Sequence, residues 1–384
     1  MRVGIVGVGP VGDRILRVLR ERQFPVTGDP VVMATSARPE VLDGREVAVR
    51  ETSEALLKDQ DVVFFAGREG AKGASKTWRP VTEKHHVPAI DNGSDFRMDG
   101  DVPLIVPEVN MDDVTLNPDF IASPNCSTIQ MVVALAPLHR AAKIKRIVVA
   151  TYQAVSGWGA KAQDELLRQA QRALAGESLD FDPSVFTHPI AFEYLPHIDR
   201  FEETGYTKEE TKMVRETRKI LGAPDLAVSA TTVRVPVFVG HGEAINVQFE
   251  GTMTADRALE ILRDPARSPG VHVMDGPSDD PNAVAIRQDP WERNYPVSRD
   301  LEQPDLADLV LVGRVRDDPT MPNTINLWVV ADNLRKGAAT NVVQIAEEML
   351  KRGLLPEYRR VMCQVSGVTC QVTARWSAES SPDT

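Results

Sequence analysis

The fold is decided by the opening stretch of the chain, Arg2-Val3-Gly4-Ile5-Val6-Gly7-Val8-Gly9-Pro10-Val11-Gly12. Its apolar run predicts a strand, which leads directly into a G-x-G-x-x-G turn, and the amphipathic residues 13–22 predict a helix. Glycines in this arrangement allow a tight turn and a close approach of the backbone, and the N-terminus of the helix can receive a pyrophosphate. The stretch therefore predicts the first unit of a dinucleotide-binding fold.

Strand and helix signals continue to alternate after this unit. Further apolar runs predict buried strands at residues 30–35, 61–66, 87–91 and 119–122. Helical patterns at residues 53–57 and 72–84 lie between them. Such alternation is typical of a doubly wound parallel sheet, which binds its ligands at the carboxyl ends of the strands.

The end of the second predicted strand, Ser36-Ala37-Arg38, bears on the choice of cofactor. Folds that select NAD usually carry an acidic residue here, which binds the ribose 2′-hydroxyl. A hydroxyl beside an arginine instead suits the 2′-phosphate of NADP. Arg38 could also be an ordinary exposed arginine, but we favour the cofactor role and predict NADP.

A second informative stretch is Ser123-Pro124-Asn125-Cys126-Ser127-Thr128-Ile129-Gln130. The strand before it ends at Pro124 and the apolar residues 129–138 predict a buried helix, so we expect Cys126 at a helix N-terminus. Unpaired N–H groups and the helix dipole favour an anion there, and we expect a thiolate stabilised relative to the usual pKa of about 8.5. A free cysteine is commonly a small buried apolar residue instead, and the octapeptide alone leaves both interpretations open.

Size and composition exclude several classes of protein. The 384 residues favour two domains, and the formal charge of -11 argues against a nucleic-acid binder. The three cysteines, Cys126, Cys363 and Cys370, form neither a disulfide framework nor a zinc-ligand cluster, so we expect no metal. No apolar run reaches the roughly 18 residues of a membrane span, and the chain opens on a strand, so a cytoplasmic protein is predicted.

The second half of the chain mixes strands with helices less regularly. Strands are predicted at residues 147–152, 227–239, 243–250, 309–316 and 323–332, and helices at 161–175, 208–221, 254–263 and 338–352. Residues 180–206 and 265–306 are expected to be largely irregular.

Individual polar residues in these segments have a functional and an ordinary interpretation. Arg97 could bind an anion at the edge of the sheet or neutralise nearby aspartates, and Glu209 with Lys212 could be a surface ion pair. His241 lies between two glycines, a setting that suits a general acid/base as well as a turn.

Taken together, these pieces resemble the aspartate-β-semialdehyde dehydrogenase family. The matching segments lie in family order across roughly residues 1–355, at 7–12, 101–110, 123–130, 151–157, 209–212, 234–241 and 332–344. The glycine turn is one residue shorter than the family's usual G-x-x-G-x-x-G, and the loop over residues 277–306 is longer than expected.

The resemblance implies an α/β protein with two domains. An N-terminal Rossmann-like doubly wound parallel sheet would occupy residues 1–127 and would be completed by a C-terminal helix at about 338–355. An α+β catalytic and dimerisation domain with a mixed sheet would occupy residues 128–337. Residues 362–384 lie outside the resemblance and are expected to form an extra, partly disordered tail.

The resemblance also implies the roles of the site residues. Cys126 would be the nucleophile that forms an acyl-thioester, His241 the acid/base group, and Gln153 the residue that orients the acyl group. The substrate would be bound at its carboxylate by Arg234, at its amino group by Glu209, and at its phosphate by Arg97, Asn125 and Lys212. The implied NADP contacts are Gly7, Gly9, Pro10, Val11, Gly12, Ser36, Ala37, Arg38, Ser156, Gly157 and Asn341.

The implied reaction is the NADPH-dependent reductive dephosphorylation of L-aspartyl 4-phosphate to L-aspartate 4-semialdehyde, in the biosynthesis of lysine, methionine and threonine. The implied assembly is a homodimer or a dimer of dimers. Three alternatives are an N-acetyl-glutamyl phosphate reductase, a non-catalytic dinucleotide-binding paralogue, and a cysteine hydrolase. Glu209 with Arg234 argues against the first, joint retention of Cys126, Gln153, Arg234 and His241 against the second, and the glycine turn against the third.

Overall fold

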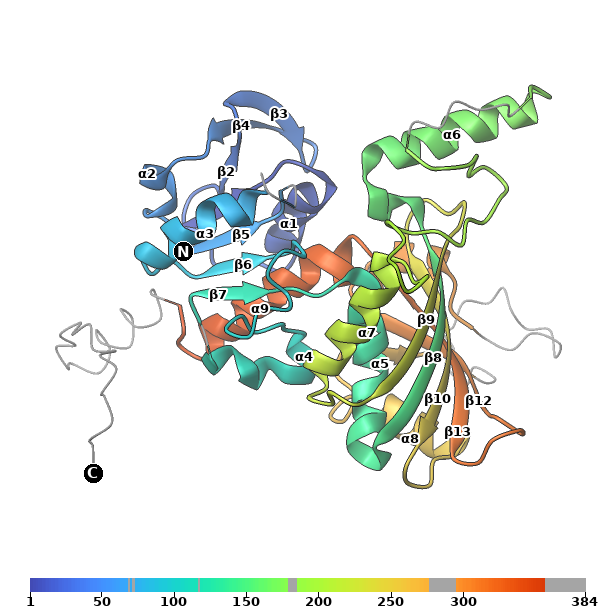
Figure 1. Cartoon of the computed structure of the whole chain (residues 1–384). Helices are drawn as coiled ribbons and strands as arrows, with labels where there is room; N and C mark the ends of the chain where they lie inside the picture. The colour runs from blue at the N-terminus through green and yellow to red at the C-terminus, as the bar shows by residue number, and fades with distance from the viewer. Residues whose placement is uncertain (68–69, 71–72, 117, 179–184, 276–294, 356–384) are drawn as a thin grey trace, which may run out of the picture.

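The computed structural model describes residues 1–67, 70, 73–116, 118–178, 185–275 and 295–355. Two sheets stand side by side, with helices between and around them (Figure 1). The predicted tail, with Cys363 and Cys370, and much of the loop predicted at residues 277–306 lie outside the described residues.

The first sheet is mostly parallel and has the strand order β3-β4-β2-β1-β5-β6-β7. Its strands are β1 (Val3–Val6), β2 (Val31–Ala34), β3 (Arg38–Leu42), β4 (Arg45–Glu51), β5 (Val62–Phe65), β6 (Ala89–Asp91) and β7 (Phe120–Ala122). The helices of this part are α1 (Pro10–Glu21), α2 (Glu54–Leu57), α3 (Ala74–Lys84) and α4 (Pro107–Asn110). The predicted doubly wound parallel sheet is confirmed.

Two local predictions for this sheet were wrong. Strands β3 and β4 form an antiparallel hairpin that was not predicted, because most of its side chains are exposed and it lacks the apolar signal of a buried strand. Helix α1 begins at Pro10, three residues before the predicted start. Proline fits the first helical turn because its missing N–H would have no partner there.

The second sheet is mixed and has the order β11-β12-β13-β10-β8-β9. Its strands are β8 (Ile144–Gln153), β9 (Ala227–Arg234), β10 (His241–Phe249), β11 (Val271–Val273), β12 (Val310–Asp317) and β13 (Thr324–Ala331). The remaining helices are α5 (Cys126–Ala142), α6 (Ala160–Leu174), α7 (Lys208–Ile220), α8 (Ala255–Arg263) and α9 (Thr340–Lys351). The expected mixed sheet is confirmed.

The strand ends of this sheet differ from the predictions in a way that matters for the site. Strand β9 ends at Arg234, five residues before the predicted end, and β10 begins at His241 instead of residue 243. His241 therefore lies on a strand and not in a turn. Within the segment expected to be irregular, the structure contains β11 and a 3₁₀ turn at Ser298–Glu302.

Helix α5 is the central element and lies between the two sheets (Figure 1). Its residues Ser127–Leu138 are all buried. They join one apolar core that includes Phe65 and Phe120 of the first sheet and Val247 and Ile325 of the second. A helix that is apolar on every side is what such a position requires.

The chain returns to the first sheet at its end. A π-helical turn at Arg335–Ala339 leads into α9, whose residues Val342, Ile345 and Met349 pack with β1 and α1 in a second core. The junction is fixed by a buried cluster in which Lys336 Nζ contacts Glu108 Oε1 at 2.7 Å, Glu108 Oε2 at 2.8 Å and Gln344 Oε1 at 2.7 Å.

Replacement of Lys336 by methionine is expected to lower the free energy of unfolding by about 3–5 kcal/mol, because the Glu108 carboxylate would remain buried without its cation. The matched control is Lys351→Met, which removes an exposed lysine paired with Glu348 and should change stability by less than about 1 kcal/mol. Guanidinium unfolding at one fixed protein concentration measures both, and equal effects of the two variants would contradict this account.

Candidate active site

Cys126 is the first residue of α5, as predicted, and Asn125 caps the helix. The Asn125 Oδ1 accepts hydrogen bonds from the N–H groups of Ser127 at 3.0 Å and Thr128 at 3.3 Å. The cap fixes the first turn of α5 and hence the position of the sulfur.

The π-helical turn packs directly against the cysteine. A Cβ atom placed on Gly337 would lie 2.8 Å from the Cβ of Cys126, closer than two carbon atoms can approach. Only glycine allows this contact, which links Cys126 to the segment that leads into α9. π-Helical turns within α-helices are frequent at functional sites.

The expected stabilisation of a resting thiolate is wrong for the structure as it stands. Burial and the Glu209 carboxylate raise the pKa of the Cys126 thiol to about 12, although Arg234 and Arg97 act in the opposite direction. The helix N-terminus is thus outweighed by the removal of water and by a neighbouring negative charge.

His241 is fully buried and its protonation state follows from its contacts. The N–H of Ala154 donates to His241 Nδ1 at 3.0 Å, so the ring proton of the neutral imidazole is on Nε2. Among the described residues Nε2 has no hydrogen-bond partner. Burial, together with Arg234, lowers the pKa of His241 well below its usual value. The side chain therefore offers a neutral Nε2–H donor.

Arg234, the last residue of β9, is 3% exposed. Its Nη1 donates to the carbonyl of Ala154 at 2.6 Å, and no described carboxylate lies within ion-pair distance. A Cβ on Gly157 would lie 3.1 Å from Arg234 Nη1 and 3.6 Å from His241 Nε2. Gly157 thus leaves open the space that the arginine and the histidine share.

Glu209 lies at the centre of a polar cluster. Its Oε1 accepts from Asn125 Nδ2 at 2.8 Å and from Gln153 Nε2 at 3.3 Å, and its Oε2 contacts Lys212 Nζ at 3.3 Å. Burial opposes ionisation, but Lys212, the Asn125 hydrogen bond and Arg234 lower the pKa of Glu209 overall. The cluster holds an ionised carboxylate next to Cys126.

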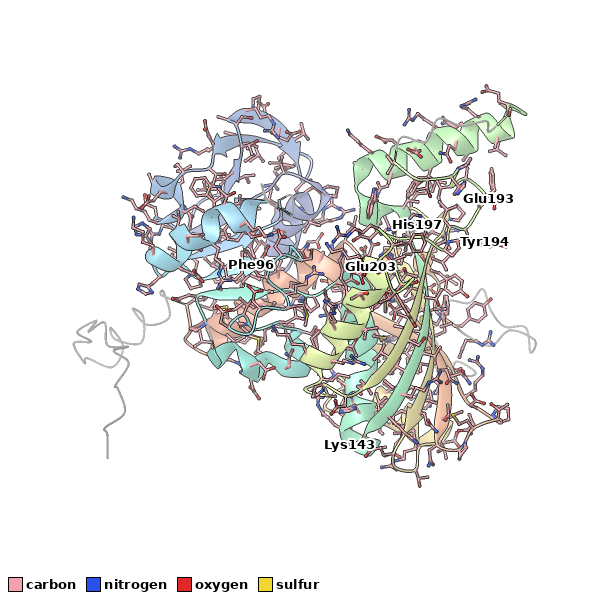
Figure 2. All side chains as sticks on the ribbon, viewed as in Figure 1. Phe96, Lys143, Glu193, Tyr194, His197 and Glu203 are labelled. Atoms are coloured by element: carbon pink, nitrogen blue, oxygen red, sulfur yellow. The ribbon has the colours of Figure 1, made fainter. Side chains whose placement is uncertain are left out.

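Arg97 lies on the first-sheet side of the cluster. Its Nη1 donates to Glu216 Oε1 at 3.0 Å, and the other Glu216 oxygen accepts the N–H of Asn125 at 2.6 Å. The preceding residue, Phe96, packs edge-to-face on Phe120 with ring centroids 5.2 Å apart (Figure 2). This contact anchors the segment that carries the arginine.

Three residues of this arrangement were not predicted from the sequence. Glu216 is seven residues after Glu209 and so shares its face of α7, a spacing that could have revealed it. Asp199, which pairs with Lys212 at 3.1 Å, lies in an irregular segment without any signal. Asn333 Oδ1 accepts from Ser156 Oγ and from the N–H of Gly240, both at 3.0 Å.

The structure thus brings all eight predicted catalytic and substrate-binding residues together in one connected cluster. Those linked by the contacts above are Arg97, Asn125, Cys126, Gln153, Glu209, Lys212, Arg234 and His241.

The glycine turn has the shape that a dinucleotide requires. Gly7 has φ +134° and its Cβ would lie 2.4 Å from the carbonyl oxygen of Ala66, while a Cβ on Gly12 would lie 2.1 Å from the oxygen of Gly7. Around Gly9, by contrast, a Cβ would meet nothing within 4 Å, and the first turn of α1, with Pro10 and Val11, follows directly. The open space at a helix N-terminus fits a pyrophosphate.

The other predicted cofactor contacts lie in different settings. Ser36 and Ala37 are exposed beyond β2, and Arg38 lies beside them with Nε 3.0 Å from Glu40 Oε2 and Nη1 3.3 Å from the Ser36 carbonyl. Asn341 is fully buried, and its Nδ2 donates to the Ile105 carbonyl at 3.0 Å and to Ser123 Oγ at 2.9 Å. Its amide nitrogen thus supports the segment before Cys126.

Two negative findings apply to the part of the chain that the structure describes. It contains no group of three or more His, Cys, Asp or Glu side chains placed to hold a metal ion. None of its helices has the length and apolar composition needed to cross a membrane.

Both halves of the chain match known protein families. Residues 2–116 match the family described as "Semialdehyde dehydrogenase, NAD binding domain", and residues 135–336 match "Semialdehyde dehydrogenase, dimerisation domain". The chain thus has the two domains of a semialdehyde dehydrogenase.

The similar proteins narrow this class. An aspartate-semialdehyde dehydrogenase from Aquifex aeolicus is 46% identical, over 92% of this chain and 99% of its own. Aspartate semialdehyde dehydrogenase II from Vibrio cholerae has a crystal structure with a TM-score of 0.78 and 41% identity, covering 91% of this chain and 98% of its own. Its structure complexed with ASA has a TM-score of 0.77 and 40% identity over the same shares. The chain belongs to the aspartate-semialdehyde dehydrogenase family.

The raised pKa of Cys126 predicts how the free enzyme reacts with an alkylating agent. Without substrate, the rate of iodoacetamide modification at Cys126 should rise about tenfold per pH unit from pH 7 to 9 with no plateau, because the pKa is about 12 and only the thiolate reacts. Mass spectrometry of the modified peptide measures the rate, and Cys126→Ser gives the background from Cys363 and Cys370. A plateau below pH 8 would contradict the structure.

Proposed function

We propose that the chain reduces L-aspartyl 4-phosphate to L-aspartate 4-semialdehyde with NADPH, through a thioester on Cys126. The observation that carries the proposal is Arg234, a buried guanidinium without a carboxylate partner among the described residues, close to Cys126 and His241. A buried cation without a counter-charge is unfavourable, so the site calls for an anionic substrate.

The two charged groups that act on Cys126, Arg234 and Glu209, match the carboxylate and the ammonium group of an amino acid. Arg234 can hold a carboxylate through two parallel hydrogen bonds, and the ionised Glu209 can bind an ammonium group. A substrate with both groups at one end and an acyl-phosphate at the other satisfies both. This favours a free amino acid over an N-acetylated one, whose amide nitrogen carries no charge.

Substrate binding also changes the reactivity of the nucleophile. The Glu209 charge raises the pKa of the Cys126 thiol, and a bound ammonium group would offset that charge. The thiolate then attacks the acyl carbon, a C–S bond forms, and the C–O bond to phosphate breaks. Arg97 and Lys212, with the Asn125 amide, would bind the phosphate.

His241 would act on the acyl oxygen. Its Nε2–H points to the side of the ring that Gly157 keeps open, and its other nitrogen is fixed by the Ala154 N–H. A neutral donor so placed stabilises negative charge that develops on the acyl oxygen as each tetrahedral stage forms. The amide of Gln153, held by Glu209, would orient the same group.

The residues of the first sheet fit the cofactor. The turn from Gly7 to Gly12 would hold the pyrophosphate, and Ser36, Ala37 and Arg38 the 2′-phosphate. Ser156, Gly157 and Asn341 remain predicted contacts at the reacting end. NADPH, when bound, supplies the hydride that reduces the thioester.

The proposal includes a homodimer, either alone or paired into a dimer of dimers. It also includes a cytoplasmic location and a role in the biosynthesis of lysine, methionine and threonine.

Exposed aromatic side chains support a second copy of the chain as the partner. Tyr152 and Trp328 lie in contact on the side of the second sheet opposite α5, with ring centroids 5.5 Å apart. Tyr194, which is 72% exposed, lies in the segment between α6 and α7 (Figure 2). The match to a dimerisation domain over this half is consistent with that assignment.

The proposed division of the chain follows the two sheets. Residues 1–127, with about 338–355, would form the cofactor domain, and residues 128–337 the catalytic and dimerisation domain. The return of α9 to the first sheet supports this division.

The decisive test is reduction of NADP in the reverse direction, followed by absorbance with aspartate semialdehyde and inorganic phosphate supplied. We expect activity that requires phosphate and is lost in Cys126→Ala, because the thioester must be cleaved by phosphate. Activity that is independent of phosphate, or that persists in the variant, would refute the mechanism. Binding of NADPH without turnover would refute the substrate.

The coenzyme assignment has a test of its own. Arg38→Ala should raise the KM for NADPH about 10- to 100-fold and leave the KM for NADH unchanged. The expected size follows from the loss of a hydrogen bond between charged groups, which contributes about 1.5–3 kcal/mol. Arg45→Ala, on the same hairpin, is the control and should alter neither constant. Equal effects of Arg38→Ala on both coenzymes would refute the 2′-phosphate contact.

A further inference from the structure

Glu243 is a buried acid without an assigned role. It lies on β10 two residues after His241, so both side chains project from the same face of the sheet, and it is 0% exposed. Among the described residues neither of its carboxyl oxygens has a hydrogen-bond partner. A carboxylate in this position would be an isolated buried charge, which proteins avoid.

Within the part of the chain that the structure describes, no charged group acts on Glu243. Its neighbours across the sheet are Thr151 on β8 and Val329 on β13, and helix α5 contributes Gln130. The titratable group two residues before it on the same face is His241, which is neutral. Burial raises the pKa of Glu243 well above its usual value, and only Gln130 opposes that shift.

In the described part of the chain, Gln130 lacks a hydrogen-bond donor to its side-chain oxygen. Its Nε2 lies 3.4 Å from the backbone carbonyl oxygen of His241, to which it donates, but its buried Oε1 has no donor among the described residues. A protonated carboxylic acid carries one O–H donor, whereas a carboxylate carries none. One hydrogen bond from a protonated Glu243 would give Gln130 Oε1 its missing donor and would leave only the uncharged carbonyl oxygen of Glu243 without one.

We propose that Glu243 is a protonated acid that donates to Gln130 Oε1, and that the pair positions the backbone of His241 for the reaction. Glu243 is then a positioning residue that never touches the substrate. The imidazole is held at Nδ1 by the Ala154 N–H, and its backbone by the Gln130 amide that Glu243 orients. The importance of this positioning for catalysis rests on the role of His241 in the proposed function. The protonation of Glu243 does not depend on that function.

Two substitutions test whether Glu243 acts as an uncharged hydrogen-bond donor or as a charged carboxylate. Glu243→Gln keeps a donor to Gln130 Oε1 and removes the acid, whereas Glu243→Leu removes both in a similar volume. We expect Glu243→Leu to lower kcat about tenfold or more with little change in the KM for NADPH, because misplacement of a reacting group acts on the chemical step. Glu243→Gln should restore kcat to within about threefold of the unsubstituted enzyme. Equal impairment of both variants, or an unimpaired Glu243→Leu, would overturn the proposal.

A second measurement needs no activity and also covers the case in which Glu243→Leu fails to fold. The unfolded chain loses the Glu243 proton above a pH of about 4.3, while the folded chain keeps it. The folded pKa is raised, so this group's contribution to stability falls as pH rises toward that pKa. Relative to Glu243→Gln, the unfolding constant of the unsubstituted protein should therefore increase about tenfold per pH unit from pH 5 to 7.

Denaturant unfolding of both proteins, at one fixed protein concentration and several pH values, measures the ratio of their unfolding constants. A ratio that does not change with pH would mean that Glu243 is ionised in the fold, and would overturn the proposal whatever the enzyme reduces. A tenfold slope together with failure of the aspartate semialdehyde assay would uphold the protonated acid and refute only the proposed substrate.

Discussion

The site depends on one residue, Asn125, because its hydrogen bonds join the start of α5 to two acids of α7. Its Oδ1 caps the helix, its Nδ2 binds Glu209, and its backbone N–H binds Glu216. Glu216 in turn holds Arg97 from the first sheet, and Glu209 holds Gln153 from the second. The position of Cys126 is thus set jointly by both halves of the chain.

The charges around this residue are arranged so that the protein alone does not balance them all. Arg97 and Lys212 have carboxylate partners, whereas Arg234 has none within ion-pair distance among the described residues. Glu209, the charged group with the largest effect on the sulfur, raises the pKa of the Cys126 thiol. In the proposed function, a zwitterionic substrate would complete the charge pairs and thereby activate the thiol, so that substrate recognition and activation of Cys126 would be the same electrostatic event.

The sequence was sufficient wherever a local pattern carries the information. The glycine turn, the alternation of elements and the break before Cys126 predicted the parallel sheet and the start of α5, because glycine, proline and apolar runs act over a few residues. The hairpin β3–β4 was missed because its strands are mostly exposed. The state of Cys126 was predicted wrongly because burial arises from packing between distant segments, which no octapeptide shows. Glu243 and Asn333 escaped notice for the same reason, since their partners lie on other elements.

The return of α9 to the first sheet has a consequence for biosynthesis of the protein. The apolar face of β1 and α1 is covered by Val342, Ile345 and Met349, residues that the ribosome adds only after the strands of the second sheet. Helix α5, buried on every side, likewise needs the second sheet before its outer face is covered. The nascent N-terminal half therefore emerges with two apolar surfaces open to water, the condition under which chains bind chaperones or aggregate. The first sheet, although it begins the chain, is thus among the last parts of the described chain to be fully covered.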